Sequence, residues 1–148
     1  MNDAVLVELT KRKLKLDNGR ITVGGSSMEK IIRDGDEVCI EVTNEYKTGN
    51  VTLVVYNSKI VVHRIVKISK DFIYTKGDNC VDMEKVKMEN CIGIVKKIQN
   101  RHMKYGLKDK IIAKFSIRVH NIWKKDYSIE KALNSFGKRM IDILQKTK

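Results

Sequence analysis

A serine, a histidine and several carboxylates occur in an order that could support acyl transfer. Ser27 lies in the glycine-rich stretch GGSSMEKIIRDGDEV, which covers residues 24–38. His63 lies in a run of β-branched residues, and Asp78 and Asp82 follow it in a polar stretch. A serine hydroxyl becomes a good nucleophile when a neighbouring base takes its proton, and neutral histidine is suited to that near pH 7. A carboxylate can then orient the imidazole, so the order is compatible with a catalytic triad.

Each of these residues alone has an ordinary structural explanation. A Gly-Gly-Ser-Ser stretch most often forms a turn, and Asp78 in KGDN would normally do the same. A single histidine in a β-branched strand more often packs than catalyses. Only the joint order favours chemistry, and a triad is recognised by geometry rather than by sequence order.

The elements that must position these residues are predicted to be strands as far as residue 98. EVCIEV alternates apolar with other residues, and NVTLVVY and IVVHRIVKI, joined by Asn57-Ser58-Lys59, predict a hairpin. FIYT and CIGIVKKI predict two further strands, separated by the loop KGDNCVDMEKVKMEN. No helix of useful length is expected before residue 98, apart from a turn that begins at Ser27.

The rest of the chain has helical periodicity. Apolar residues recur at helical spacing within KDKIIAKFSIRVHNIWKK, and a second stripe runs from Ile129 to Leu144, with Ser128 as its N-cap. We therefore expect a β catalytic domain over residues 1–98 and a basic helical segment over residues 99–148.

The positive charge is uneven along the chain. Residues 1–95 contain 15 Lys and Arg against 14 Asp and Glu, whereas residues 96–148 contain 15 against 4. The net charge of +12 therefore belongs almost entirely to the second part. This pattern predicts either solvated outer faces of helices or contact with an anionic partner.

Several classes of protein are not expected. The longest charge-free run is residues 48–58, well short of the roughly 18 residues that a membrane helix requires. The start of the chain, MNDAVLVELTKRK, has early acids and only a short apolar patch, so it does not indicate a secretory signal. Cys39, Cys80 and Cys91 are odd in number and lack CxxC spacing, which favours reduced thiols in a cytoplasmic protein. No metal site and no cofactor are expected.

Three stretches resemble the sequence boxes of type I signal peptidases. GGSSMEKIIRDGDEV resembles G-x-S-M-x-P-x-I-x-x-G-D, and GNVTLVVYNSKIVVHRIVKI is similar to the box whose second strand carries the general base. YTKGDNCVDMEKVKMENCIGIV resembles T-K-G-D-N, followed by an acidic residue and E-N-V-I-G-x-V. The resemblance covers residues 21–98 and implies a mainly β fold. The implied architecture is a coiled-sheet barrel of the signal-peptidase and LexA type, here followed by two C-terminal helices.

The resemblance implies roles for individual residues. Ser27, which precedes Met28, would be the nucleophile and His63 the general base. Bacterial signal peptidases and LexA-type repressors place lysine at the base position, so His63 indicates the endoplasmic-reticulum and archaeal branch. A histidine needs little pKa tuning for this role, whereas a lysine must be buried.

The third member of the site has more than one candidate. Counting back from ENCIG selects Asp82, and counting forward from GDN without a gap selects Glu84. Asp78 belongs to the G-D-N itself, which resembles a structural element with a supporting role. We expect Asp82 to orient His63, with Asp78 as the second choice. The supporting residues are Ser26, Met28, Asp36 and Asp78.

Two positions depart from the family pattern. Lys30 stands where the family usually has proline, which predicts a less rigid turn after the nucleophile. Gly25 stands where many members have a serine that assists the oxyanion hole, so the backbone N–H of Ser27 would carry more of that role.

The resemblance predicts a serine endopeptidase that removes N-terminal leader or signal segments from precursor peptides. A catalytically lapsed member that serves as an interaction protein is one alternative. A basic nucleic-acid-binding module is another, and it is disfavoured because no recognised nucleic-acid-binding motif is present. For residues 108–148 we expect peripheral contact with an anionic membrane, with burial of Phe115, Trp123 and Phe136 against the β domain as the alternative.

Overall fold

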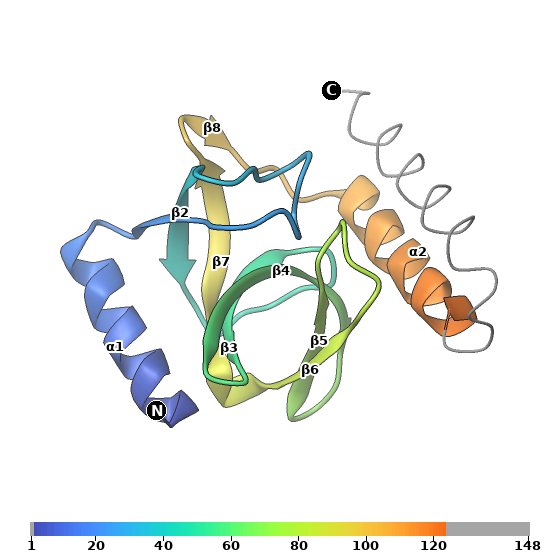
Figure 1. Ribbon diagram of the computed structural model, residues 1–148, viewed down its shortest axis with the longest axis horizontal. Helices are drawn as coiled ribbons and strands as arrows, with labels where there is room; N and C mark the ends of the chain where they lie inside the picture. The colour runs from blue at the N-terminus through green and yellow to red at the C-terminus, as the bar shows by residue number, and fades with distance from the viewer. Residues whose placement is uncertain (1, 124–148) are drawn as a thin grey trace.

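The computed structural model describes residues 2–123, and within them a curled antiparallel sheet lies between two helices (Figure 1). The elements in chain order are α1 (Asp3–Leu16), β1 (Arg20–Thr22), β2 (Glu37–Val42), β3 (Val51–Tyr56), β4 (Lys59–Ile68), β5 (Phe72–Lys76), β6 (Glu84–Lys87), a 3₁₀ turn (Met88–Asn90), β7 (Cys91–Ile98), β8 (Arg101–His102) and α2 (Leu107–Trp123). The expected mainly β fold is confirmed.

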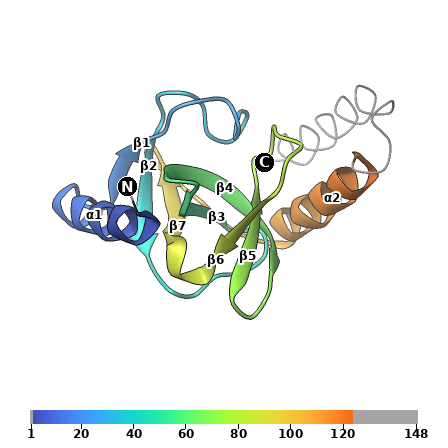
Figure 2. The same ribbon diagram turned by 60° about the horizontal axis from the view of Figure 1, so that its bottom comes forward.

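The sheet has the strand order β1-β2-β7-β3-β4-β5-β6, with β8 paired to β7. Its register shifts between Cys39 and Ile40, between Leu53 and Val54, and between Ile65 and Lys67. Such irregularities bend strands and increase their twist. The sheet curls into a half-barrel, which Figures 1 and 2 show as the ring formed by β3 to β6.

The predicted hairpin forms from β3 and β4 and carries the histidine, but Lys59 belongs to β4 and the connection is Asn57-Ser58 alone. Asn57 and Ser58 both have positive φ values, 49° and 58°. Two consecutive positive values are typical of the type I′ turn that matches the twist of the flanking strands. The register that follows places His63 opposite Thr52 of β3.

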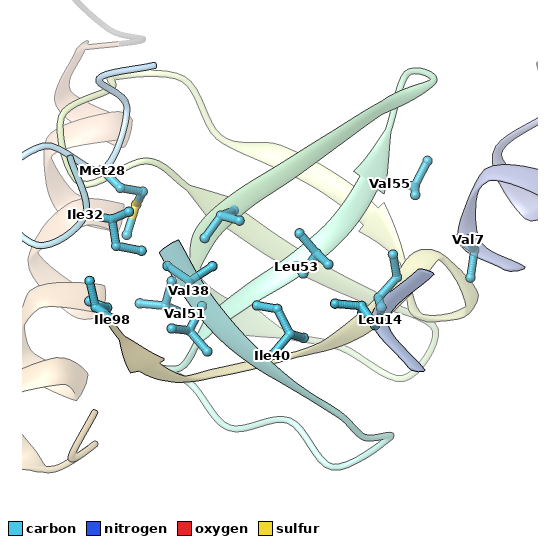
Figure 3. Close-up of a cluster of buried hydrophobic side chains, with 13 residues drawn as sticks. Val7, Leu14, Met28, Ile32, Val38, Ile40, Val51, Leu53, Val55 and Ile98 are labelled. Atoms are coloured by element: carbon cyan, nitrogen blue, oxygen red, sulfur yellow. The ribbon is translucent and has the colours of Figure 1, made fainter. Parts of the chain in front are cut away.

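The main core packs the sheet against two segments that precede β2, the helix α1 and the loop that carries Ser27. Val38, Val51 and Leu53 are fully buried strand residues at its centre. Met28 and Ile32, which follow the candidate nucleophile, point into the same cluster (Figure 3). The loop that carries Ser27 is therefore anchored in the core at two points on the C-terminal side of this residue.

The prediction that no helix precedes residue 98 is wrong, because α1 covers one side of the sheet (Figure 2). The Asn2 side chain caps the helix by accepting a hydrogen bond of 3.0 Å from the Ala4 N–H. The buried face consists of Val7, Thr10 and Leu14, so one of its three positions is polar. Other apolar residues of α1 face outward, with Leu16 83% exposed, and this mixture obscures the helical stripe in the sequence.

The predicted loop between the last two strands is only partly a loop. Its second half forms β6, which pairs with β5 over four residues, and the 3₁₀ turn that leads into β7. β6 is four residues long, and only Val86 within it is buried and apolar. Such a strand has little of the alternation by which strands are recognised.

The first predicted C-terminal helix is confirmed as α2, and the second, with Ser128 as its N-cap, lies outside the described residues. α2 buries Ile112, Ala113 and Val119, and Phe115 is half-buried. The side chains of Trp123 and Phe136 are also outside the described part. Within residues 2–123, no helix is long and apolar enough to cross a membrane.

Candidate active site

Ser27 lies in the loop between β1 and β2, where backbone hydrogen bonds form a compact turn. The Glu29 N–H donates to the Ser26 carbonyl at 3.1 Å, and the Ile32 N–H donates to the Met28 carbonyl at 2.9 Å. The Gly25 N–H donates to Asp34 Oδ1 at 2.7 Å. Ser27 is half-buried on this turn, so its position depends on backbone contacts rather than on a regular strand.

Asp36 closes the base of this loop. Its carboxylate accepts hydrogen bonds from the Arg33 N–H and from Gln99 Nε2, both at 2.8 Å. Its carbonyl accepts one from the Val23 N–H at 2.9 Å. Asp36 therefore supports the site through the loop that carries Ser27, and it makes no hydrogen bond to His63 in the described structure.

The G-D-N segment holds the nucleophile turn from the other side. The Asn79 N–H donates to the Ser27 carbonyl at 2.8 Å, and Asn79 Nδ2 donates to the Ser26 carbonyl at 3.1 Å. The Asp78 N–H donates to the Met28 sulfur at 3.4 Å. The glycine-rich stretch and the G-D-N segment thus meet, through hydrogen bonds to the carbonyls of Ser26 and Ser27 and to the Met28 sulfur.

His63 approaches Ser27 across Gly77. A Cβ atom added at Gly77 would lie 2.7 Å from the Ser27 carbonyl oxygen and 3.1 Å from His63 Nε2. The histidine is only 6% exposed, and its Nε2 and the Ser27 carbonyl both lie close to the same point beside Gly77. Among residues 2–123, Ser27 Oγ forms no hydrogen bond with His63, and such contacts are often long in unliganded sites.

The carboxylate that meets His63 is Glu84. Its side chain lies 2.8 Å from His63 Nδ1 and accepts a second hydrogen bond, of 2.6 Å, from the Thr75 hydroxyl. Thr75 and Glu84 are cross-strand partners on β5 and β6, and Thr75 is fully buried. When the Nδ1–H donates to Glu84, Nε2 is left as an acceptor on the side that faces Ser27.

The structure therefore places Glu84, and not the expected Asp82, against His63. β6 begins at Glu84, whose pairing with Thr75 brings its side chain to the histidine. Asp82 precedes the strand and is one of the acids whose charge acts on Lys76. The gap-free count from the G-D-N had pointed to Glu84. The decisive signal was the beginning of a short strand that the sequence pattern did not reveal.

A buried lysine, Lys76, lies within this acidic region. Lys76 is 4% exposed, and burial lowers its pKa, although the nearby Asp78, Cys80, Glu84 and Asp82 act in the opposite direction. Burial likewise raises the pKa of the Cys80 thiol.

Asp78 serves a buried ion-pair network next to the site. Arg64, directly after His63, is fully buried and binds Asp78 through two hydrogen bonds of 2.9 Å. Arg64 Nη1 also donates to Asp109 on α2 and to the Gly49 carbonyl, both at 2.8 Å. Burial opposes the charge of Arg64, but the two carboxylates hold its pKa above its usual range. Asp78 thus fixes the G-D-N segment to β4, and no pattern in the sequence indicates Arg64 as its partner.

The two departures from the family pattern match the local backbone. Lys30 has a φ of 87°, which proline cannot adopt because its ring holds φ near −65°. Gly25 has a φ of 91°, in the region that favours glycine over serine. The turn after Ser27 therefore has a backbone conformation that Lys30 adopts and that a proline ring would not allow.

A groove of about 760 Å³ runs from Ser27 toward α1. Apolar side chains of β1, β3 and β4, including Ile21, Leu53 and Val62, line it near the sheet. Thr10 and Lys13 of α1 line its far side. The candidate nucleophile is thus at the edge of a concave surface large enough for several residues of a peptide.

Two comparisons with known proteins bear on the family of this chain. A comparison with curated proteins finds no match. A family model described as Peptidase S24-like matches residues 13–99. The match covers more than half of the chain and includes Ser27, His63, Thr75 and Glu84, and the protein therefore belongs to the Peptidase S24-like family of serine-peptidase-type hydrolases.

Proposed function

We propose that this protein is a serine endopeptidase that cleaves N-terminal leader or signal segments from precursor peptides through an acyl-enzyme. The observation that carries the proposal is the position of His63, which contacts Glu84 through Nδ1 and faces the Ser27 turn through Nε2. Acyl transfer requires a carboxylate that orients the imidazole and a nucleophile within reach of its other nitrogen, and the position of His63 between Glu84 and the Ser27 turn supports the proposal.

In the proposed reaction, His63 Nε2 takes the Ser27 hydroxyl proton as Oγ attacks the scissile carbonyl. The resulting imidazolium is stabilised by Glu84 and then protonates the leaving amine as the C–N bond breaks. A water molecule, deprotonated by His63, hydrolyses the acyl-enzyme and restores Ser27. Thr75 acts as a positioning residue, because its hydroxyl donates to the carboxylate that orients the histidine.

An extended peptide fits the groove because strand edges border it. β1 is the edge of the sheet at one end of the strand order. β4 pairs with β5 only from Arg64 onward, so residues 59–62 have no strand partner on that side. A peptide that adds to such edges gains main-chain hydrogen bonds, while pockets select its side chains. The apolar lining by Leu53 and Val62 favours apolar side chains next to the scissile bond.

The use of histidine as base supports assignment to the signal-peptidase branch of the endoplasmic-reticulum and archaeal type. His63 lies in a strand and its Nδ1 is paired with a carboxylate, the arrangement in which histidine serves as a general base. The third residue is Glu84, which is one methylene longer than the Asp82 that we had expected in this position.

The test is to incubate the protein and its Ser27→Ala variant with precursor peptides encoded near its gene and to analyse the products by mass spectrometry. We expect one new C-terminus and one new N-terminus to appear with the wild-type protein alone. If both proteins have the same unfolding transition and neither cleaves any peptide, the protein is a catalytically lapsed member of the family.

A further inference from the structure

We propose that a second groove, on the other side of the Ser27 turn, binds an acidic segment of the precursor peptide that also carries apolar side chains. This inference rests on the proposed function, because the ligand is part of the same substrate. The second groove is defined by two adjoining hollows that share Lys30, Ile31 and Arg101.

The larger apolar surface of the second groove lies where α2 begins. One hollow, of about 200 Å³, is lined by Ile31, Met103, Leu107 and Ile112 together with cationic side chains. Leu107 is 74% exposed and is therefore accessible to a ligand in this hollow. This hollow can receive an apolar side chain of a bound peptide.

The rim of the second groove is positively charged. Arg101 and Lys104 border the first hollow, and Arg33 borders the second. All three are exposed, and within residues 2–123 their side chains form no ion pair with a carboxylate. Their charges are therefore available to an anionic ligand.

The two carboxylates in the lining are already engaged. Asp36 accepts hydrogen bonds from the Arg33 N–H and Gln99 Nε2. Asp109 pairs with the buried Arg64 at 2.8 Å and accepts a hydrogen bond of 2.9 Å from the Gly106 N–H. Neither acid neutralises the cations at the rim, so the groove is complementary to a ligand with negative charges.

The concave shape favours a peptide over the other anionic partners. A membrane surface is best met by apolar side chains that protrude, as on an amphipathic helix, whereas here Ile31, Met103 and Ile112 line a hollow. A nucleic-acid backbone gains little from an apolar floor, and single strands are usually bound on exposed aromatic side chains. Within the described lining of the second groove there is no aromatic residue.

The position of the second groove suits a peptide that also reaches the active site. Ser27 lines the first groove, and Lys30 and Ile31 line the second, so the two grooves flank a single turn of the chain. A residue in an extended peptide spans at most about 3.6 Å, and a few residues therefore suffice to connect the two sites. The acidic segment would lie across the Ser27 turn from the part of the substrate that occupies the first groove.

The experiment measures binding separately from cleavage. Fluorescent peptides in which Glu alternates with Leu, with counterparts in which Gln or Lys replaces Glu, are titrated by anisotropy into the full-length Ser27→Ala protein at low and high salt. The test variant is Arg101→Glu/Lys104→Glu. Lys15→Glu/Lys70→Glu is the matched control, since it changes the charge equally at exposed lysines outside both grooves.

We expect the Glu peptide to bind more tightly than the Gln peptide, with a loss of about tenfold in the test variant and little change in the control. Leu107→Asn should weaken the Glu and Gln peptides alike, because it removes an apolar contact. When Ser27 is kept, the Arg101→Glu/Lys104→Glu substitutions should raise KM for an acidic precursor while kcat is unchanged.

Three results would overturn the proposal. One is equal affinity of the protein for the Glu and Gln peptides. Another is a loss of affinity in the control variant as large as that in the test variant, which would show that only the net charge of the protein matters. The third is binding of anionic phospholipid vesicles or of a DNA oligonucleotide that depends on Arg101 and Lys104 when peptide binding does not. Binding by Ser27→Ala together with no cleavage by the wild-type protein would instead reject the peptidase function.

Discussion

Glu84 determines the orientation of His63 because its carboxylate is itself held in place. The Thr75 hydroxyl donates to Glu84 at 2.6 Å, and the carboxylate lies 2.8 Å from His63 Nδ1. The ring therefore has one favoured orientation, with Nε2 directed toward the Ser27 turn. A carboxylate in this position stabilises the imidazolium that forms during acyl transfer.

Replacing Glu84 with glutamine should lower kcat by about 10²–10⁴-fold, because a neutral amide neither fixes the required tautomer nor stabilises the imidazolium. The matched control is Asp82→Asn, which removes an acid from the same segment without a contact to His63. We expect this control to lose less than about tenfold. Steady-state cleavage of a precursor peptide measures both variants. A larger loss for Asp82→Asn would restore the original prediction for the third residue.

Gly77 is needed because the nucleophile turn and the histidine both approach its Cα. A methyl group at Gly77 would lie 2.7 Å from the Ser27 carbonyl, 2.9 Å from Cys80 Sγ and 3.1 Å from His63 Nε2, so Gly77→Ala should displace the Ser27 backbone, which is the nearest of the three. A displacement of about 1 Å at a reacting group can cost about 10²-fold in rate. Gly106→Ala is the control, since a methyl group there meets no atom within 4 Å. Equal cleavage rates for the two variants would show that Ser27 and His63 do not function across Gly77.

The segments that meet at the candidate site were more predictable than the carboxylate that contacts His63. Ser27 and His63 lie in segments with strong signals, a glycine-rich turn and a β-branched strand, and the structure brings both next to Gly77. The partner of His63 depends on where a four-residue strand begins, and that start is set by pairing between β5 and β6. Local sequence patterns do not contain such a long-range register, and Thr75 and Arg64 were missed for the same reason.

At the scale of the elements, Arg64 connects three parts of the molecule. It is on β4, it binds Asp78 of the G-D-N segment, and it binds Asp109 on α2. Gly49 supplies a carbonyl to the same guanidinium. The network therefore joins the strand of the candidate base to the segment that holds Ser27, and it fixes the first turns of α2 to the sheet.

Arg64→Met should destabilise the protein by about 3–5 kcal/mol, because it leaves two carboxylates without their buried partner. Urea unfolding followed by circular dichroism measures the change. Arg12→Met is the control, since Arg12 forms an exposed pair with Glu8 and should contribute less than about 1 kcal/mol. A loss for Arg64→Met no larger than that of the control would mean that the network does not hold the elements together.

The strands were predictable because each long one carries an uninterrupted β-branched or alternating pattern. β2, β3, β4, β5 and β7 all coincide with predicted segments. α1 was not predicted, since its apolar residues divide between a buried face with Leu14 and an outer face with Leu16. Which face of such a helix packs against the sheet is decided by tertiary contacts, which local periodicity does not contain.

For the whole molecule, the buried thiol of Cys91 gives a defined pH dependence of stability. Burial raises the pKa of Cys91 from 9.0 to about 12. Between these values the unfolded chain loses a proton that the folded protein retains, so the free energy of unfolding decreases as the pH rises. Below pH 9 the contribution of the thiol is fully present.

Cys91→Val should therefore reduce the alkaline loss of stability. Between about pH 9 and pH 11, the wild-type protein should lose at most about 1.4 kcal/mol per pH unit through this thiol, and the variant should lose less. Urea unfolding at several pH values measures the slope. The reference is pH 7, at which the Cys91 thiol is protonated in both the folded and the unfolded protein. Parallel slopes for the two proteins would contradict the assignment.

The central claim is that Ser27 and His63 act as one catalytic unit, and cleavage of a precursor peptide by Ser27→Ala, His63→Ala and the double variant tests it most directly. We expect each single variant to lose nearly all activity and the double variant to be no worse than either one, because residues that act as a unit are not additive. Ser26→Ala, the neighbouring hydroxyl, should retain activity. Turnover by Ser27→Ala that equals the wild-type rate, or losses that multiply in the double variant, would contradict the account.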